Sequence, residues 1–131
     1  VFLLIDLFPV RKGHLLVIPQ EHRKDINELD EETKLEIFKA ANLSKKVLKD
    51  VFNAKAFNLG FNIGENAGQT VEHIHLHVIP RYDEDESNSR GGIRKATIKH
   101  PKSNLKQEWK KNRISNNERD KIIREINKKY E

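Results

Sequence analysis

The sequence predicts an α+β domain in which a mainly antiparallel sheet packs on one long helix. The first observation is the order of segments: two short apolar stretches, one long stretch with helical spacing, two further β-type stretches and a charged tail. The second is a strict alternation over residues 56–63, with apolar side chains on one face and small polar residues on the other. We therefore expect the helix to cover one face of the sheet and the other face to stay open.

The first 19 residues predict a β-hairpin. Residues 1–7 and 14–18 are apolar enough for two strands, and the loop 8–13 between them carries Pro9 and Gly13. Pro19 closes the second strand.

A long helix should follow, capped by Asp30 and running to about Phe52. Helical spacing places one apolar stripe along it, which we expect to face the sheet: Leu35, Phe38, Ala41, Leu48 and Phe52.

Two more strands complete the predicted sheet. Residues 56–63 form the alternating strand, 64–70 a loop, and 71–79 a strand that Pro80 ends. Residues 82–104 show no clear period. The pattern Ser115-x-x-Glu118 is a capping box, and Ile122, Ile126 and Tyr130 after it predict a short C-terminal helix.

The composition limits the classes of function. A chain of 131 residues is one domain, and it holds no apolar run near the ~18 residues that a membrane span needs. The absence of Cys excludes a disulfide framework and a thiolate zinc site in these residues and favours the cytoplasm. The start at Val1, within an apolar stretch and without Met, suggests that residues upstream are missing.

The charge is divided unevenly along the chain. Residues 1–89 carry 11 Lys/Arg against 15 Asp/Glu, whereas residues 90–131 carry 14 against 5. Such a basic arm indicates either a solvated helix face, which the interspersed acids favour, or a surface that grips nucleic acid.

Three histidines alternate with apolar residues in His73-Ile-His75-Leu-His77. On a strand, this spacing sets the three imidazoles on one face and Ile74, Leu76 and Val78 on the other, buried face. Two rival interpretations are exposed polar residues and a metal site, which would use two of the imidazoles and some third ligand.

Covalent phosphoryl chemistry explains the pattern better. A neutral imidazole is a good nucleophile when one ring nitrogen is free and a hydrogen bond fixes the other. His75 has polar neighbours on both sides: His73 can help fix its tautomer, while His77 and Gln69 can donate to phosphate oxygens.

The chain from Val1 to about Arg81 resembles the histidine triad (HIT) nucleotide-binding superfamily. The resemblance rests on GQTVEHIHLHVIPR at residues 68–81 and GHLLVIP at residues 13–19, together with Asp6 and Asn62. It implies a HIT-like nucleotide-binding core at 1–81 and a basic C-terminal extension of the same domain at 82–131. That tail is longer than in the phosphoramidase branch, and Trp109 with the helix after it resembles the end of the fragile-histidine-triad branch.

By this resemblance, His75 attacks the α-phosphorus of a nucleotide, and the resulting nucleotidyl-histidine is then hydrolysed by water. The backbone carbonyl of His73 would take the Nδ1 proton of His75. The other implied roles are phosphate contacts for His77, Gln69 and Thr70, ribose contacts for Asp6, an apolar clamp on the base from Leu4, Leu7 and Leu16, a phosphate-side or sugar-side amide from Asn62, and a supporting position for His14. His22 and His100 receive no role.

The expected function is a nucleotide hydrolase or transferase that acts on dinucleoside polyphosphates, with a nucleoside phosphoramidase as the alternative. Two alternatives of another class are a module that binds or deadenylates nucleic-acid ends and a nucleotide-sensing scaffold. No metal or cofactor is required by this chemistry, although Mg²⁺ can accompany a polyphosphate. We also expect a homodimer, from the resemblance and from a sheet too small to bury all its apolar strands.

Overall fold

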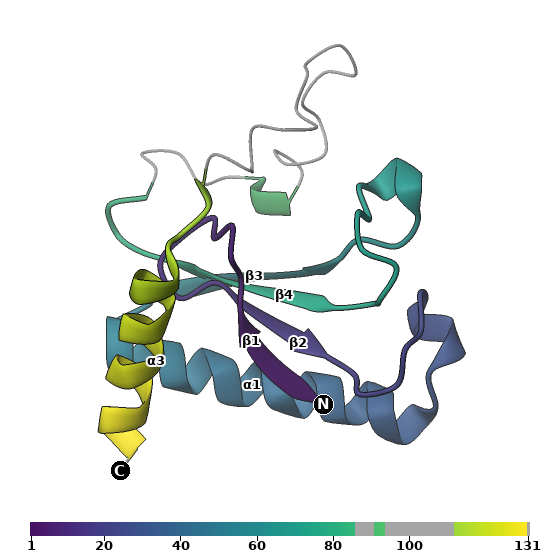
Figure 1. The fold of residues 1–131 in the computed structure, drawn as a ribbon, viewed down its shortest axis with the longest axis horizontal. Coiled ribbons are helices and arrows are strands. Elements are labelled where there is room, and N and C mark those ends of the chain that lie inside the picture. Colours follow the sequence, from purple (N-terminus) through teal and green to yellow (C-terminus); the bar gives the residue numbers. More distant parts are fainter. Residues whose placement is uncertain (86–90, 94–111, 131) are drawn as a thin grey trace.

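The computed structural model describes residues 1–85, 91–93 and 112–130. Four strands, β1 (Phe2–Ile5), β2 (Leu15–Ile18), β3 (Ala56–Phe61) and β4 (Leu76–Arg81), form one sheet in this part of the chain, in the order β1-β2-β4-β3. Every neighbouring pair is antiparallel. Helix α1 (Glu31–Phe52) lies along one face of the sheet, as Figure 1 shows. The predicted fold class is therefore confirmed.

The ends of α1 form as the sequence predicts. The Asp30 side chain accepts the Thr33 backbone N–H at 2.7 Å, which satisfies an amide that the helix itself leaves unpaired. At the other end Asn53 adopts the left-handed conformation, with φ 59°, and its N–H donates to Lys49 O.

The predicted apolar stripe of α1 was wrong in part. Leu35 and Phe38 are 55% and 51% exposed, and the buried face consists of Ile37, Ala41, Ser44 and Leu48. Ser44 can lie in this face because its hydroxyl donates to Ala40 O at 2.8 Å, so burial leaves no polar group unpaired.

The sheet alternates as expected between the face on α1 and the open face. Leu15, Val17, Leu76 and Val78 are buried against the helix, whereas the side chains between them, including His77, are only half-buried. The first strand ends at Ile5 rather than residue 7, because the Asp6 carboxylate accepts the Phe8 N–H at 2.8 Å and starts a turn.

The predicted strand 71–79 is shorter at its start and longer at its end. Strand β4 begins only at Leu76, where pairing with β3 starts, so His73 and His75 precede it and the three imidazoles do not share one strand face. Pro80 lies inside β4 rather than ending it. Pairing of β4 with β2 ends at Val78. Pro80 lies beyond that point, so its missing N–H removes no hydrogen bond to β2.

The C-terminal helix α3 (Asn116–Tyr130) packs against α1. Its predicted capping box is present, since Ser115 Oγ accepts the Glu118 N–H and the Glu118 carboxylate accepts the Ser115 N–H. Ile122 is buried, and the Tyr130 hydroxyl donates to Asp50 on α1 at 2.9 Å. Trp109 and His100 lie outside the described residues.

In the described part of the chain, no helix combines the length and apolarity that crossing a bilayer requires.

Candidate active site

His77 stands in the middle of the open face. The strand registers place Leu4, Leu16, His77 and Gly60 in one row across all four strands. Directly opposed residues of antiparallel strands point to the same side, so two of the predicted base-clamp leucines share the face of His77. Gly60 presents no side chain beside the imidazole, and a Cβ added there would meet nothing within 4 Å.

A chain of hydrogen bonds fixes which nitrogen of His77 carries the proton. The Val10 N–H can only donate, so His14 Nδ1, 3.1 Å away, accepts and the neutral ring carries its proton on Nε2. His14 Nε2 is 2.9 Å from His77 Nδ1 and therefore donates to it. His77 is left with its proton on Nε2, which makes Nε2–H a hydrogen-bond donor. We call Val10, His14 and His77 the amide relay.

Both rings of the relay are uncharged at neutral pH. Burial lowers the pKa of His77 to about 4, and the neighbouring His14 and His75 add to the effect, while Asp6 opposes it. Burial also lowers the pKa of His14, which is 2% exposed. His77 therefore offers a neutral N–H donor rather than an imidazolium.

His75 has the opposite arrangement of donor and acceptor. Its Nδ1 lies 2.8 Å from the backbone carbonyl of His73, which can only accept, so Nδ1 is protonated and the neutral ring carries its lone pair on Nε2. The rings of His75 and His77 meet edge to face, with centroids 4.8 Å apart. One ring thus offers an acceptor nitrogen and its neighbour a donor N–H.

The His73 ring turns away from this pair. Its Nε2 donates to Pro19 O at 2.9 Å, and its Nδ1 lies 3.3 Å from Nδ1 of His22. Sequence reasoning gave His22 no role because it stands alone among charged residues, and no local pattern marks a partner 51 positions away.

Asp6 lies close to the rings of His14 and His77. One carboxylate oxygen closes the turn to Phe8, and the other lies 3.4 Å from His14 Nε2 and 3.8 Å from His77 Nδ1. Its side chain is 14% exposed. In this arrangement, the carboxylate opposes the lowering of both imidazole pKa values by burial. A ribose contact would have to reach it from that partly covered position.

The remaining predicted residues lie in loops and turns that border the strands. Gln69 is held by the backbone at both ends of its amide: Oε1 accepts the Gly64 N–H and Nε2 donates to Lys24 O. This leaves the second Nε2 hydrogen for a phosphate oxygen. Thr70 is exposed, and Asn62 is half-buried just beyond β3. Leu7 lies in the turn after β1, where its carbonyl accepts the Ile114 N–H.

A charged cluster lies at the other end of the open face. The buried Asp85 carboxylate accepts from Arg11 Nε at 2.7 Å and from Arg81 Nε at 2.8 Å, and Arg81 Nη1 donates to Asn58 on β3. Burial alone would raise the pKa of Asp85, but hydrogen bonds from Arg81, the Tyr82 N–H and Arg11 together hold this pKa below its usual value. The cluster anchors the start of the C-terminal extension to the sheet. Sequence reasoning missed it because these residues come from separate loops and strands.

One trio of described residues has the spacing of a metal site. The donor atoms of Asp6, His14 and His77 all lie within 4.8 Å of one another. However, His14 would have to give up its Nε2 proton, and the resulting Nδ1–H would meet the Val10 N–H head-on. The hydrogen bond from the Val10 N–H therefore favours a protonated His14 Nε2 over a metal-bound one. The Nδ1 atoms of His22 and His73 have a spacing that one zinc ion could bridge, but the described residues place no third donor with them.

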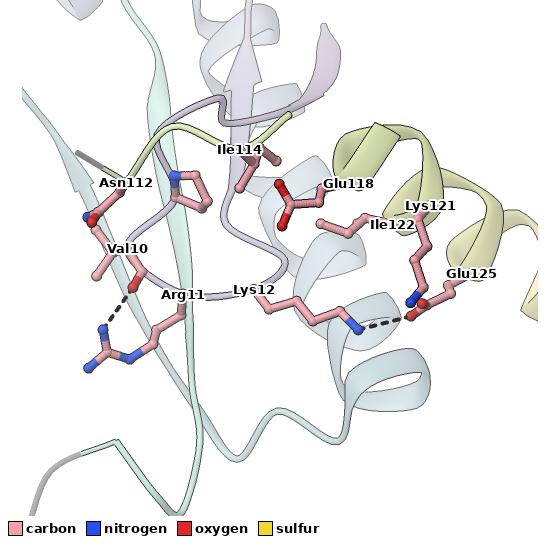
Figure 2. Close-up of a pocket in the computed structure, with 10 residues that line it drawn as sticks. Val10, Arg11, Lys12, Asn112, Ile114, Glu118, Lys121, Ile122 and Glu125 are labelled. Atoms are coloured by element: carbon pink, nitrogen blue, oxygen red, sulfur yellow. Dashed lines mark hydrogen bonds and ion pairs between the residues drawn. The ribbon is translucent and has the colours of Figure 1, made fainter. Parts of the chain in front are cut away.

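A cavity of about 610 Å³ has no histidine among its lining residues. It lies between the loop at Pro9–Lys12 and α3 (Figure 2). Its walls carry charges of both signs, and Lys12 is paired with Glu125 across it at 3.1 Å. Mixed and paired charges do not suit a polyphosphate. The triad is therefore the candidate active site, because of its donor and acceptor geometry.

Two curated proteins are similar to somewhat less than two thirds of this chain. A curated bis(5'-nucleosyl)-tetraphosphatase (asymmetrical) from Schizosaccharomyces pombe is 38% identical over 85 residues, which are 65% of this chain and 47% of that protein. An adenosine 5'-monophosphoramidase from the same organism is 40% identical over 81 residues, 62% of this chain and 58% of that protein. The chain therefore spans about half the length of these relatives.

A solved structure agrees with the fold over nearly the whole chain. The hypothetical histidine triad nucleotide-binding protein of Sulfolobus tokodaii superposes with a TM-score of 0.71 and 29% identity, covering 95% of this chain and 74% of that one. The family model described as HIT domain matches residues 1–84, which include the sheet, α1 and every residue of the triad. This chain belongs to the HIT domain family.

Proposed function

We propose that this protein hydrolyses nucleotides at the α-phosphorus through a covalent nucleotidyl-histidine on His75, with dinucleoside polyphosphates as substrates. The observation that carries the proposal is the pairing of two differently prepared rings: His75 with an unprotonated Nε2, and His77 with a protonated one. A nucleophile beside a hydrogen-bond donor is what in-line displacement at phosphorus needs.

In the first step, the Nε2 lone pair of His75 forms a bond to phosphorus, and the bond from phosphorus to the leaving phosphate breaks. The leaving oxygen takes the electron pair, and the Nε2–H of His77 donates a hydrogen bond to the oxygens that gain charge. The nucleotidylated His75 ring is a cation that keeps its Nδ1–H, so the carbonyl of His73 stabilises it.

In the second step, water attacks the same phosphorus and the bond from phosphorus to His75 Nε2 breaks. The electron pair returns to Nε2, the ring becomes neutral again, and the water proton leaves with the mononucleotide product or the solvent. No metal enters either step.

The open face of the sheet offers an apolar surface for a nucleoside next to His77. Leu4, which is 50% exposed, and Leu16 extend the row of His77 towards the β1 edge. An apolar platform next to a phosphoryl-transfer centre suits a flat base.

The decisive experiment is a quench of the enzyme with a slowly hydrolysed adenylate. The digest is kept alkaline, because phosphoramidates are acid-labile, and the added mononucleotide is mapped by mass spectrometry. We expect it on His75 alone. The His75→Ala variant should bind nucleotide and lose nearly all turnover, since the nucleophile is gone. An adduct elsewhere, or wild-type turnover by this variant, contradicts the mechanism.

The leaving group is tested separately. One of the curated relatives is named for a dinucleoside tetraphosphate and the other for a phosphoramidate, so both substrates belong in one panel. We expect the larger kcat/KM with diadenosine tri- or tetraphosphate. A larger value with adenosine phosphoramidate would assign the alternative substrate to the same His75 chemistry.

A further inference from the structure

The loop between β1 and β2 carries the N–H on which the amide relay depends. Among the described residues, pairing of β1 with β2 ends at Ile5 and Leu15, so the Val10 N–H lies in a loop beyond the paired strands. The Val10 side chain is 43% exposed, so little packing fixes it. A surface loop of this kind moves unless other contacts hold it. Hydrogen bonds to the loop therefore decide where this N–H points.

Arg11 holds Val10 through its guanidinium group. Its Nη1 donates to Val10 O at 2.8 Å (Figure 2), and its Nε donates to the Asp85 carboxylate at 2.7 Å. The Asp85 side chain is 8% exposed. It also accepts from Arg81 Nε on β4 and from the Tyr82 N–H, so it is fixed to the end of the sheet. One planar, charged group thus joins the Val10 carbonyl to the sheet.

A second bond from the same region holds the loop. The Tyr82 hydroxyl donates to Lys12 O at 2.6 Å. Tyr82 follows Lys12 by 70 positions, and Asp85 follows Arg11 by 74, so both contacts come from the chain that leaves β4. We call Arg11, Tyr82 and Asp85 the loop anchor.

Asp6 does not decide which nitrogen holds the proton between the two rings of the relay. Its carboxylate oxygen lies 3.4 Å from His14 Nε2 and 3.8 Å from His77 Nδ1, and it favours a proton on either atom. With the proton on His77 Nδ1, the Nε2 of that ring would present a lone pair to a phosphate oxygen. His14 would then carry its own proton on Nδ1, where the Val10 N–H already points. The position of the Val10 N–H therefore selects the arrangement with a donor on His77.

We propose that Arg11 is a positioning residue for the proton-donor ring of His77. Anchored on Asp85, it holds the Val10 N–H against His14. The amide relay then keeps the proton of His77 on Nε2. The inference rests on the proposed function, in which that N–H stabilises the phosphate oxygens. It gives the start of the C-terminal extension a part in catalysis that is exerted from outside the triad.

Two substitutions in the loop separate the anchor from the loop in general. Arg11→Met removes both guanidinium contacts and leaves Asp85 paired with Arg81. Lys12→Met is the matched control, because it removes one cation from the same loop, and the Lys12 side chain bonds to α3 rather than to the anchor. The Arg11 side chain is 32% exposed and that of Lys12 is 54% exposed, so we expect both variants to fold.

Tyr82→Phe tests the anchor by a second route. It removes only the hydroxyl that donates to Lys12 O and keeps the aromatic ring. Its effect should have the same direction as that of Arg11→Met and be smaller, because the guanidinium still holds Val10. This variant carries the test if Arg11→Met does not fold.

The first measurement is the tautomer of His77, read from the ¹⁵N shifts of its ring at neutral pH, where the ring is uncharged. We expect a protonated Nε2 in the wild type and in Lys12→Met. Arg11→Met should show a mixture of the two tautomers, and Tyr82→Phe a smaller share of the Nδ1–H form. A loss of stability alone would leave the tautomer of the folded protein unchanged.

The second measurement is steady-state turnover of a dinucleoside polyphosphate. In Arg11→Met, kcat should fall about 2- to 10-fold with KM nearly unchanged, because the fraction of molecules with the donor falls by the preference that one hydrogen bond gives. Lys12→Met should keep the wild-type kcat.

The outcomes distinguish this inference from the proposed function. A wild-type His77 spectrum in Arg11→Met overturns the inference, and so do equal losses of kcat in Arg11→Met and Lys12→Met. A shifted tautomer in Arg11→Met, in a protein whose His75→Ala form still turns over, supports the anchor and rejects His75 as nucleophile. An unshifted tautomer in a protein that forms the adduct on His75 alone overturns the anchor and leaves the proposed function standing.

Discussion

Acidification should destabilise the fold through His77. Its folded-state pKa of about 4 lies below the value of about 6.5 in an unfolded chain. Above pH 6.5 the ring is neutral in both states, and His77 adds nothing to the pH dependence. Between pH 6.5 and 4 the unfolded chain takes up a proton that the folded protein refuses, so the free energy of unfolding falls; below pH 4 both states are protonated and the loss is complete.

The size of the effect follows from the two pKa values. The side chain of His77 is 21% exposed, so solvent screens the effect only modestly. At pH 4.5 a shift from about 6.5 to about 4 costs the folded state about 2.5 kcal/mol, and at pH 7.5 it costs nearly nothing. This is a large fraction of the stability of a domain of this length.

The assay is urea unfolding of the wild type and His77→Asn at pH 7.5 and pH 4.5. Asparagine keeps an acceptor for His14 Nε2–H but does not titrate, and most other titrating groups are common to both proteins and cancel in the difference. Relative to the wild type, the variant should gain about 2.5 kcal/mol between pH 7.5 and pH 4.5. If the free energy of unfolding fell equally in both proteins between pH 7.5 and pH 4.5, the argument that burial keeps His77 neutral would be refuted.

Three further outcomes follow from the fold. Gly13→Ala should lower the free energy of unfolding by at least about 2 kcal/mol in urea, because φ is +87° and the new Cβ would lie 2.8 Å from Leu48 Cδ2; no change would mean that the loop relaxes. Asp30→Ala should cost about 1 kcal/mol by the same assay, through loss of the α1 cap, and an unchanged midpoint would argue against that cap. The exposed Leu35 and Phe38 on α1 lead us to expect a homodimer in light scattering at micromolar concentration. A monomer would contradict this expectation.

Helix caps and strand faces could be predicted from the sequence, because they depend on residues close together in the chain. The Asp30 cap and the Ser115–Glu118 capping box involve residues within three positions of one another, so their patterns predict their hydrogen bonds. Alternation likewise separated the buried Val78 from the half-buried His77, because a period of two needs no knowledge of distant neighbours.

The sequence also marked the histidines but not how they are held. His14 meets His77 across 63 positions, and His22 meets His73 across 51. Only packing of the hairpin beside β4 brings these rings together, and only then do fixed backbone groups, the Val10 amide and the Pro19 carbonyl, assign their protons.

The tertiary structure likewise decided which stripe of α1 is buried. Leu35 and Phe38 are as apolar as the residues that the core accepted, and helical spacing accommodates either set. The choice depends on how the helix packs on the sheet. Ser44 can be buried because its hydroxyl donates a hydrogen bond within the helix. Periodicity thus determined that a helix and a sheet would form, whereas the contact between them determined which side chains face each other, because that contact depends on residues far apart in the chain.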